Sequence, residues 1–297
     1  MTNEIRIDAL LPAEMAEKAE AIGVRKAQMK FVPMIALAIL AGAFIALGAI
    51  YATTVLAGGI SVKAPDASTA FTTALPYGIN RLLAGLVFCV GLILVVVGGA
   101  ELFTGNNLIV MAWADGKVTT AGLLRNWIIV YVGNFIGSVA TAVIMFFSMQ
   151  YMFSNGAIGL TALNIAKAKV ELGFIQAIAL GIMCNALVCL AVWMTFSARS
   201  VMDKIAAIIF PISAFVAAGF EHSVANMYFI PIGLFIKDFA GEKFWAAIGK
   251  TSADFSSLTW GSFLFNNLLP VTIGNIIGGG VMVAAVYYIV FLRKNGK

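Results

Sequence analysis

The sequence predicts an all-α membrane protein with six transmembrane helices, arranged as two inverted three-helix repeats in which helices 2 and 5 are interrupted. Three observations support this fold class. Hydrophobic residues make up 61% and charged residues 11% of the 297 residues, whereas soluble domains contain roughly 45–50% and about 25%. Several uncharged stretches exceed the roughly 18 residues that a helix needs to span a bilayer. In addition, three short motifs recur in the same order in both halves of the chain.

The uncharged stretches divide the chain into six elements. We expect four continuous helices near residues 31–56, 126–151, 172–197 and 267–292. The other two elements are each interrupted by one acidic residue, Glu101 in one and Glu221 in the other. Their segments are 82–100 with 102–114, and 205–220 with 222–236. The connections are then expected near 57–80, 115–125, 152–171, 198–204 and 237–266.

The two halves of the chain match element by element. The matching segments are 31–39 with 174–182, 99–106 with 219–226, and 133–137 with 274–278. The second pair shares the pattern G-x-E-x-x-x-x-N, and the third pair shares G-N-x-I-G. Because three spans are an odd number, the second copy must cross the membrane in the opposite direction. In inverted repeats of this kind, the substrate pathway lies at the interface between the copies.

The basic residues predict the orientation of the chain. An even number of elements places both termini on one side, and that side carries 12 of the 19 Lys and Arg residues. This excess predicts that the side is the cytoplasm. We therefore expect a cytoplasmic amphipathic segment at 1–30, a transmembrane channel domain at 31–293 and a cytoplasmic tail at 294–297. A short surface helix should start at Pro12 and lie near the membrane, with a plug or a partner-docking element as the alternative.

Composition also excludes several classes of function. The basic residues are spread too thinly between apolar runs to form a nucleic-acid surface. Cys89, Cys184 and Cys189 lie inside apolar runs and have neither metal-ligand nor disulfide spacing, so we predict no metal and no cofactor. A membrane enzyme would need a second catalytic group beside the single histidine, His222, and we therefore predict that the chain is not an enzyme.

The two interruptions contain the candidate site residues. A non-helical turn at membrane depth is tolerated only where protein or a water-filled cavity satisfies its backbone, and the second half-helices point positive dipole ends at the centre. This arrangement favours an anion. His222 at the second break is the strongest candidate for donating a hydrogen bond or a proton to it. Thr104 at the first break is its candidate partner, with a bond to its own helix backbone as the alternative.

Further polar and apolar residues near the breaks have two possible roles. Glu101, Asn106, Glu221 and Asn226 are expected to be structural at the helix breaks, with a proton relay as the alternative for the two glutamates. Intramembrane asparagines such as Asn134, Asn185 and Asn275 usually form hydrogen bonds between helices. Apolar residues near the breaks either pack or form hydrophobic constrictions. These residues are Phe88, Leu92, Phe103 and Phe215.

Five strings of the sequence resemble the signature of the formate/nitrite transporter family. They lie at residues 99–104, 185–193, 197–204, 215–227 and 270–280. The resemblance implies an aquaporin-like protomer that assembles as a homopentamer in the bacterial inner membrane, with an anion pathway in each protomer. It also implies that His222 is the central pore histidine and that Thr104 is its partner.

Other residue roles follow from the resemblance alone. Phe88, Phe215 and Val188 would form the outer constriction, and Leu92 with Leu102 or Phe103 would form the cytoplasmic one. Lys169, on the external loop before element four, would attract anions, and Asn185 would lie near the pore lining. The family further suggests a cytoplasmic metabolic enzyme as a partner at the N-terminus.

The predicted function is therefore a transmembrane channel or transporter for formate and related small monovalent anions, bidirectional and pH-dependent. Nitrite and hydrosulfide remain alternatives within the family. A water or glycerol channel shares the inverted repeat, but Asn-Pro-Ala boxes are absent at both breaks. A cation-coupled transporter would require more intramembrane charge than the chain contains.

Overall fold

A computed structural model describes residues 9–58, 60–63, 69–73 and 75–293, and it confirms the predicted helical membrane fold. The first half contains α1 (Pro12–Ala27), α2 (Phe31–Leu56), β1 (Ile60–Lys63), β2 (Thr69–Thr73), α3 (Tyr77–Gly98), η1 (Gly105–Ile109), α4 (Val110–Ala114) and α5 (Thr120–Phe147). The second half contains η2 (Gln150–Met152), α6 (Ala157–Val170), α7 (Phe174–Ser197), α8 (Val201–Ala217), α9 (Ser223–Phe239), α10 (Glu242–Ile248), η3 (Ser252–Phe255), η4 (Ser262–Leu268), α11 (Leu269–Ile276), η5 (Ile277–Ala285) and η6 (Tyr288–Leu292).

Five helices in the described part of the chain are long and apolar enough to cross a membrane. They are Phe31–Leu56, Tyr77–Gly98, Thr120–Phe147, Phe174–Ser197 and Ser262–Leu292. The last of these runs continuously from η4 to η6 and includes π-helical turns. The remaining predicted element, at 205–236, is divided into α8 and α9, each of 17 residues, because the chain leaves the helix between Ala217 and Ser223.

Both interrupted elements break at the same repeat position. Gly99 has φ 74° and Gly219 has φ 75°, and glycine is favoured at such left-handed positions after a helix because it has no Cβ. The first break leads into the short η1 and α4, whereas the second leads into the longer α9. The breaks therefore lie where the acidic interruptions predict them.

Glycine residues allow the first and third helices of each repeat to approach each other closely. A Cβ at Gly137 of α5 would overlap the carbonyl oxygen of Ile39 in α2, and a Cβ at Gly278 would overlap the carbonyl oxygen of Ile182 in α7. Small residues at such positions allow backbones to approach in membrane helices. The G-N-x-I-G motif is thus a helix-packing motif in both copies.

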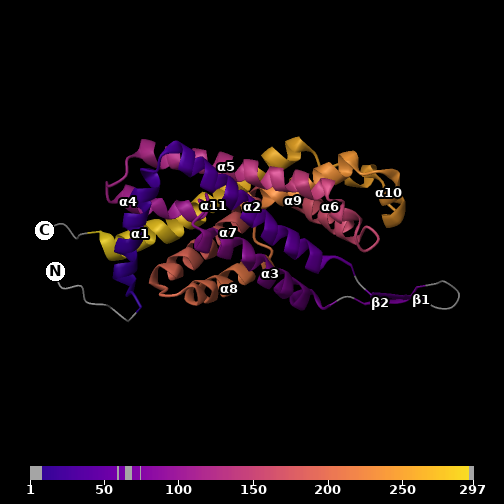
Figure 1. Ribbon diagram of the computed structural model, residues 1–297, viewed down its shortest axis with the longest axis horizontal. Coiled ribbons are helices and arrows are strands. Elements are labelled where there is room, and N and C mark those ends of the chain that lie inside the picture. The colour runs from indigo at the N-terminus through magenta and orange to yellow at the C-terminus, as the bar shows by residue number, and fades with distance from the viewer. Residues whose placement is uncertain (1–8, 59, 64–68, 74, 294–297) are drawn as a thin grey trace.

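The connections contain structure that the sequence did not predict. An antiparallel hairpin of β1 and β2, with Ile60 opposite Thr73, joins α2 to α3 and projects from the helical body (Figure 1). The expected connection at 152–171 forms α6, and α10 forms within 237–266. These short segments lack the long apolar runs that identify the spanning helices.

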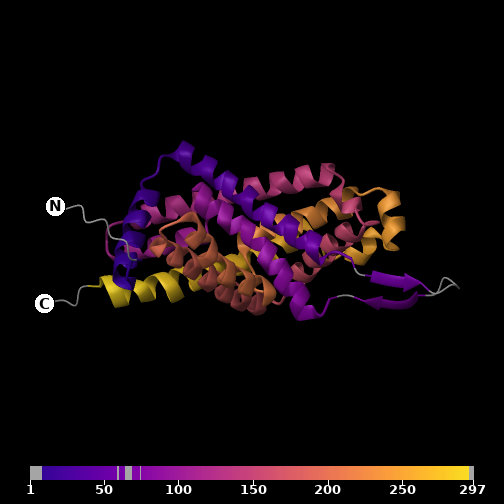
Figure 2. The same ribbon diagram turned by 60° about the horizontal axis from the view of Figure 1, so that its bottom comes forward.

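The N-terminal segment folds against one end of the bundle. Helix α1 begins at Pro12, as predicted, and buries Met15, Ala16 and Ala19 against a cluster that includes Leu108 and Met111. Figure 2 shows α1 and the end of the last helix at one end of the molecule, with the hairpin at the other. Residues 1–8 and 294–297, which belong to the predicted terminal segments, lie outside the described residues.

Candidate transport pathway

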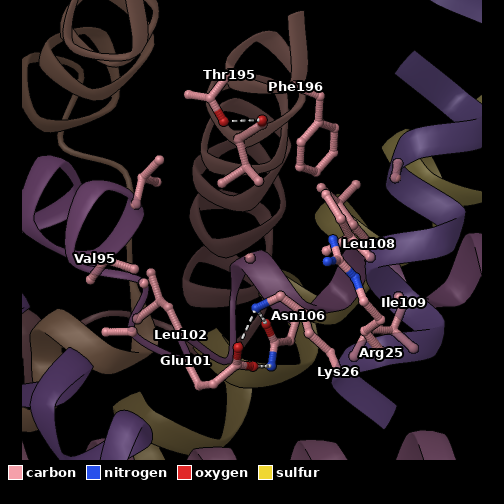
Figure 3. A pocket seen from close by; sticks show the side chains of 18 residues that line it. Arg25, Lys26, Val95, Glu101, Leu102, Asn106, Leu108, Ile109, Thr195 and Phe196 are labelled. Carbon is pink, nitrogen blue, oxygen red and sulfur yellow. Dashed lines mark hydrogen bonds and ion pairs between the residues drawn. The ribbon is translucent and has the colours of Figure 1, made fainter. Parts of the chain in front are cut away.

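A buried ion-pair network holds the first break. Lys26 Nζ contacts Glu101 Oε1 at 2.7 Å and donates to Asn106 Oδ1 at 2.9 Å. Asn106 Nδ2 donates to Glu101 Oε2 at 2.7 Å and to Asn126 Oδ1 at 2.9 Å, as Figure 3 shows for Glu101 and Asn106. Asn126 Nδ2 in turn donates to the Lys26 carbonyl oxygen at 3.1 Å. The carboxylate is therefore both paired and hydrogen-bonded, as a buried charge requires.

The second break contains the same network. Lys169 Nζ contacts Glu221 Oε1 at 2.6 Å, and Asn226 Nδ2 donates to Glu221 Oε2 at 2.7 Å and to Asn267 Oδ1 at 2.7 Å. Asn267 Nδ2 donates to the Lys169 carbonyl oxygen at 2.8 Å. Two differences separate the copies: Asn226 Oδ1 has no hydrogen-bond partner within the described chain, and Asn267 Nδ2 also donates to Glu221 Oε2 at 3.2 Å. These contacts agree with the structural role expected for both glutamates.

Sequence reasoning missed three members of these networks, although a signal for them was present. Lys26 and Lys169 each lie five residues before the first pair of matching segments, outside the motif. Asn126 and Asn267 each lie eight residues before the asparagine of G-N-x-I-G. Extending the repeat comparison beyond its apolar motifs would have found Lys26, Asn126 and Asn267 together.

The asparagines of the G-N-x-I-G motifs satisfy the backbone at the breaks. Asn134 Nδ2 donates to the carbonyl oxygen of Glu101 at 2.9 Å, and the Phe103 N–H donates to Asn134 Oδ1 at 2.9 Å. In the second copy Asn275 Nδ2 donates to the carbonyl oxygen of Glu221 at 3.0 Å, and the Ser223 N–H donates to Asn275 Oδ1 at 2.9 Å. The predicted hydrogen bonds between helices are confirmed, because Asn134 Nδ2 also donates to the Ala38 carbonyl oxygen of α2 at 2.7 Å and Asn275 Nδ2 to the Gly181 carbonyl oxygen of α7 at 2.8 Å. The bonds to the turns satisfy their unpaired backbone groups.

The two copies differ in sequence where the two turns meet. His222 follows Glu221 at the position that Leu102 occupies after Glu101. Thr104 Oγ1 lies 3.0 Å from His222 Nε2, and both side chains are buried. The structure therefore brings the two principal candidate residues into direct contact across the interface between the copies.

The hydrogen bonds of His222 assign its tautomer. Its Nδ1 accepts a hydrogen bond from the Ala225 N–H at 3.0 Å and caps α9. In a neutral imidazole the other nitrogen then carries the proton, so Nε2–H donates to Thr104 Oγ1. A doubly protonated ring has two donors and no acceptor, so it would lose the bond from Ala225. The helix cap therefore favours a neutral ring that presents a donor to the pathway.

Two cavities flank the contact between Thr104 and His222. The N-terminal vestibule, of about 370 Å³, is lined by residues of α1, α3, η1 and α7, among them Arg25, Lys26, Glu101 and Leu102 (Figure 3). The hairpin-side vestibule, of about 260 Å³, is lined among others by Arg81, Phe88, Lys169, Phe215, Glu221 and His222. Each vestibule thus ends at one of the two helix breaks.

Aromatic rings form the wall beside His222. The Phe88 and Phe215 rings meet edge to face with their centroids 5.6 Å apart. The Phe215 ring lies 6.0 Å from the His222 ring in a stacked arrangement. The structure therefore places two of the three residues expected at the outer constriction next to the histidine.

On the other side, the structure distinguishes Leu102 from Phe103. Leu102 lines the N-terminal vestibule. Phe103 instead packs edge to face on Tyr131 and Trp127, with centroid distances of 4.9 and 5.9 Å. Leu102 is therefore the better placed of the two for a constriction.

Leu92 and Val188 are buried and line neither vestibule. Leu92 lies one turn from Phe88, which lines the hairpin-side vestibule, and one turn from Val95, which lines the N-terminal one. Val188 lies one turn before Val192 of the N-terminal vestibule. Residues three or four apart share a helix face, so both side chains lie on the faces that border the pathway.

Two expected pathway residues have different surroundings from those implied by the resemblance. Asn185 is fully buried, and its Nδ2 donates to the carbonyl oxygens of Asn275 at 2.7 Å and Thr104 at 3.3 Å. It supports the first break and is absent from the lining of both vestibules. Lys169 lies in the last turn of α6 instead of a loop, and its ammonium group is paired with Glu221.

Comparisons with known proteins agree with this architecture. A family model described as formate/nitrite transporter matches residues 13–289. The chain is 46% identical to the formate channel FocA of Escherichia coli K12 over 288 residues, covering 97% of this chain and 96% of the relative. It is 42% identical to FocA of Haemophilus influenzae, covering 93% and 92%. A solved structure of a pentameric formate channel with formate bound has a TM-score of 0.80 at 46% identity, covering 89% and 98%.

Proposed function

The chain belongs to the formate/nitrite transporter family, and we propose that it is a membrane channel for formate and related small monovalent anions. It is a channel or transporter and not an enzyme. The observation that carries the proposal is the contact of Thr104 Oγ1 with His222 Nε2, which separates two vestibules that begin at opposite ends of the molecule. A pathway with this layout supports flux in either direction, set by the gradient of the anion.

The mechanism must offset the cost of placing an anion near the membrane centre. That cost is about 3 kcal/mol or more for a charged side chain by the lower estimates. The His222 Nε2–H is the donor that the helix cap leaves available, and the Thr104 hydroxyl lies beside it. An anion reaching the contact accepts the Nε2–H bond in place of Thr104 Oγ1, and the freed Thr104 hydroxyl donates a second hydrogen bond to it. The positive end of the α9 dipole acts in the same direction.

The hydrogen bonds favour His222 as a hydrogen-bond donor over a net proton donor. Release of the Nε2 proton from the neutral ring would leave an imidazolate, and prior protonation at Nδ1 would break the cap from Ala225. The proton that converts formate to neutral formic acid therefore comes from a hydronium ion of the solvent in the vestibule. The neutral acid crosses the apolar residues more easily than the ion, which gives flux that rises at lower pH.

Apolar residues on both sides of this contact form the constrictions in this proposal. Phe88, Phe215 and Val188 form the outer constriction, and Leu92 with Leu102 forms the cytoplasmic one. Burial of all five side chains supports this assignment. The contacts of Glu101, Asn106, Glu221 and Asn226 support a structural role at the breaks.

Formate flux into proteoliposomes tests the role of the central contact. His222→Phe and Thr104→Val should each lower the flux at least about tenfold, because a hydrogen bond to a charged group contributes about 1.5–3 kcal/mol. Thr141→Val is the matched control, since the Thr141 hydroxyl donates only to its own helix at Gly137 among the described contacts. An unchanged rate in His222→Phe would refute the mechanism, whereas the rise of flux at lower pH should remain in this variant because solvent supplies the proton.

A substrate panel distinguishes the alternatives. Radiolabelled formate, nitrite, lactate and glycerol are compared in the same proteoliposomes, with hydrosulfide as a competitor of formate uptake. Formate should pass, and each of the other small anions should inhibit formate uptake in proportion to its own flux. Passage of glycerol without formate would instead indicate a neutral-solute channel.

The assembly and location of the channel are part of the same proposal. We infer a homopentamer in the bacterial inner membrane with both termini in the cytoplasm, so that the N-terminal vestibule opens inward. The pentameric state of a 46% identical channel supports the assembly, and the excess of basic residues on the terminal side supports the orientation. Native mass spectrometry tests the first, and protease accessibility of residues 1–30 in spheroplasts tests the second.

The N-terminal segment is also the proposed docking place for a cytoplasmic metabolic enzyme. Leu11 at the start of α1 has an apolar side chain that is 68% exposed, which supports a contact surface there. Cross-linking from this position in cells, compared with cross-linking from the hairpin end, tests for such a partner.

A further inference from the structure

Each vestibule contains the same set of charged groups. The N-terminal vestibule has Arg25, Lys26 and Glu101, and the hairpin-side vestibule has Arg81, Lys169 and Glu221. In each set the lysine and the glutamate form an ion pair, at 2.7 and 2.6 Å. Because a paired lysine and glutamate contribute no net charge, the positive charge of each vestibule comes from its arginine.

The Arg81 guanidinium is held by backbone carbonyl oxygens and not by a carboxylate of the described residues. Its Nη2 and Nε donate to the carbonyl oxygens of Val216 and Ala217, the latter at 3.5 Å, in the last turn of α8. These acceptors are neutral, and no carboxylate within the described ranges pairs with the guanidinium. A guanidinium has five N–H donors, so donors remain for an anion in the vestibule. The same contacts place a cation at the negative end of the α8 dipole.

Arg25 provides the corresponding charge at the other end. It lies on α1 next to Lys26, and its side chain is exposed to the vestibule. Figure 3 shows it directed toward Leu108 and away from the network of Lys26, Glu101 and Asn106. No hydrogen bond or ion pair joins it to another described side chain.

The two arginines do not arise from the repeat. The positions equivalent to Arg25 and Arg81 in the second half are Ala168 and Val201. The repeat itself supplies only the neutral lysine–glutamate pairs. Two unrelated positions therefore bring the two vestibules to the same charge.

We propose that Arg25 and Arg81, and not Lys26 and Lys169, concentrate small monovalent anions in the two vestibules. The inference rests on the proposed function of anion conduction. Arginine suits a carboxylate because its donors form a planar fork that matches two oxygens. One uncompensated charge at roughly 10 Å raises the local anion concentration about three- to tenfold at intermediate dielectric. Salt weakens the effect, because the Debye length is about 8 Å at physiological ionic strength.

The concentration dependence of formate flux tests this inference. Arg25→Gln, Arg81→Gln and the double variant should raise the half-saturating formate concentration about three- to tenfold at low salt, with the maximal flux nearly unchanged. Arg25→Lys and Arg81→Lys should restore the wild-type value, because they retain the charge. The difference between wild type and the glutamine variants should shrink as salt is raised.

Two results would overturn the inference. The half-saturating concentration could stay unchanged in the double variant, or the maximal flux alone could fall, which would indicate a structural role through the α8 carbonyl oxygens. Thermal unfolding of each variant reports that structural effect separately. Absence of formate flux in the wild-type protein would instead refute the proposed function, so the two failures are distinguishable.

Discussion

Removal of the Lys169 ammonium group should destabilise the protein strongly, because it leaves a buried carboxylate without its cation. In Lys169→Met, Glu221 keeps the amide donors of Asn226 at 2.7 Å and Asn267 at 3.2 Å but loses the ion pair at 2.6 Å. The Glu221 side chain is only 6% exposed. A lost bond to a charged group costs about 1.5–3 kcal/mol, and a broken buried pair costs about 3–5 kcal/mol. We expect a loss of about 3 kcal/mol.

The assay is reversible unfolding in mixed micelles, which gives the free energy of unfolding for each variant. Lys167→Met is the matched control on the same helix, because its Nζ lies 3.9 Å from Glu171, both side chains are exposed, and its bond to the Asp254 carbonyl oxygen at 3.1 Å is also exposed. Exposed pairs contribute about 0–1 kcal/mol, so this variant should resemble wild type. The double variant of Lys169→Met with Glu221→Gln should recover at least about 1.5 kcal/mol, since no unpaired charge remains.

Two outcomes would contradict this reasoning. A loss below about 1 kcal/mol in Lys169→Met would mean that the pair is solvated and behaves like an exposed one. Strict additivity of the two substitutions would mean that the groups are not coupled. Formate flux through Glu221→Gln adds a separate test, because a proton relay would lose its pH response in this variant and a structural residue would not.

Two further predictions concern the glycine contacts between helices and the N-terminal helix. Gly278→Ala should lower the free energy of unfolding by about 3 kcal/mol or more, because the new Cβ would overlap the rigid carbonyl oxygen of Ile182. Gly261→Ala is the control, because Gly261 has space for a Cβ, and it should change the free energy of unfolding by less than about 0.5 kcal/mol. Burial raises the pKa of Glu20 above its ordinary value of 4.5 against the opposing effect of Lys117. A raised carboxyl pKa stabilises the docked α1 below pH 4.5, and this contribution is lost as pH rises through the folded-state pKa. Proteolysis of α1 should therefore slow as pH falls from 7 toward 4.5, and Glu20→Gln should abolish that dependence; a pH dependence retained in the variant would contradict the assignment.

The order of the spans and the position of the breaks were predictable from local patterns. Long apolar runs identify spanning helices because each crossing must bury about 20 residues in lipid. The acidic interruptions at Glu101 and Glu221 marked the breaks because a charge is expensive at membrane depth. The repeat placed His222 and Thr104 at equivalent turns, which was sufficient to select them as candidates.

Connections were the least predictable part of the fold. The hairpin of β1 and β2 and the short α6 and α10 lie in segments that the apolar pattern marked only as loops. The placement of Lys169 on a loop was wrong for this reason. Short elements depend on tertiary contacts more than on their own periodicity.

The sequence by itself determined the membrane class, the inverted repeat, the breaks and the identity of the polar residues within the broken segments. Only the tertiary structure decided which charges neutralise each other, because Lys169 and Glu221 are 52 residues apart and meet through packing. It also placed Leu102, and not Phe103, in the lining of the N-terminal vestibule, since helical periodicity does not extend through a non-helical turn. The direct contact of Thr104 with His222 likewise depends on how the two copies pack, which no local pattern encodes.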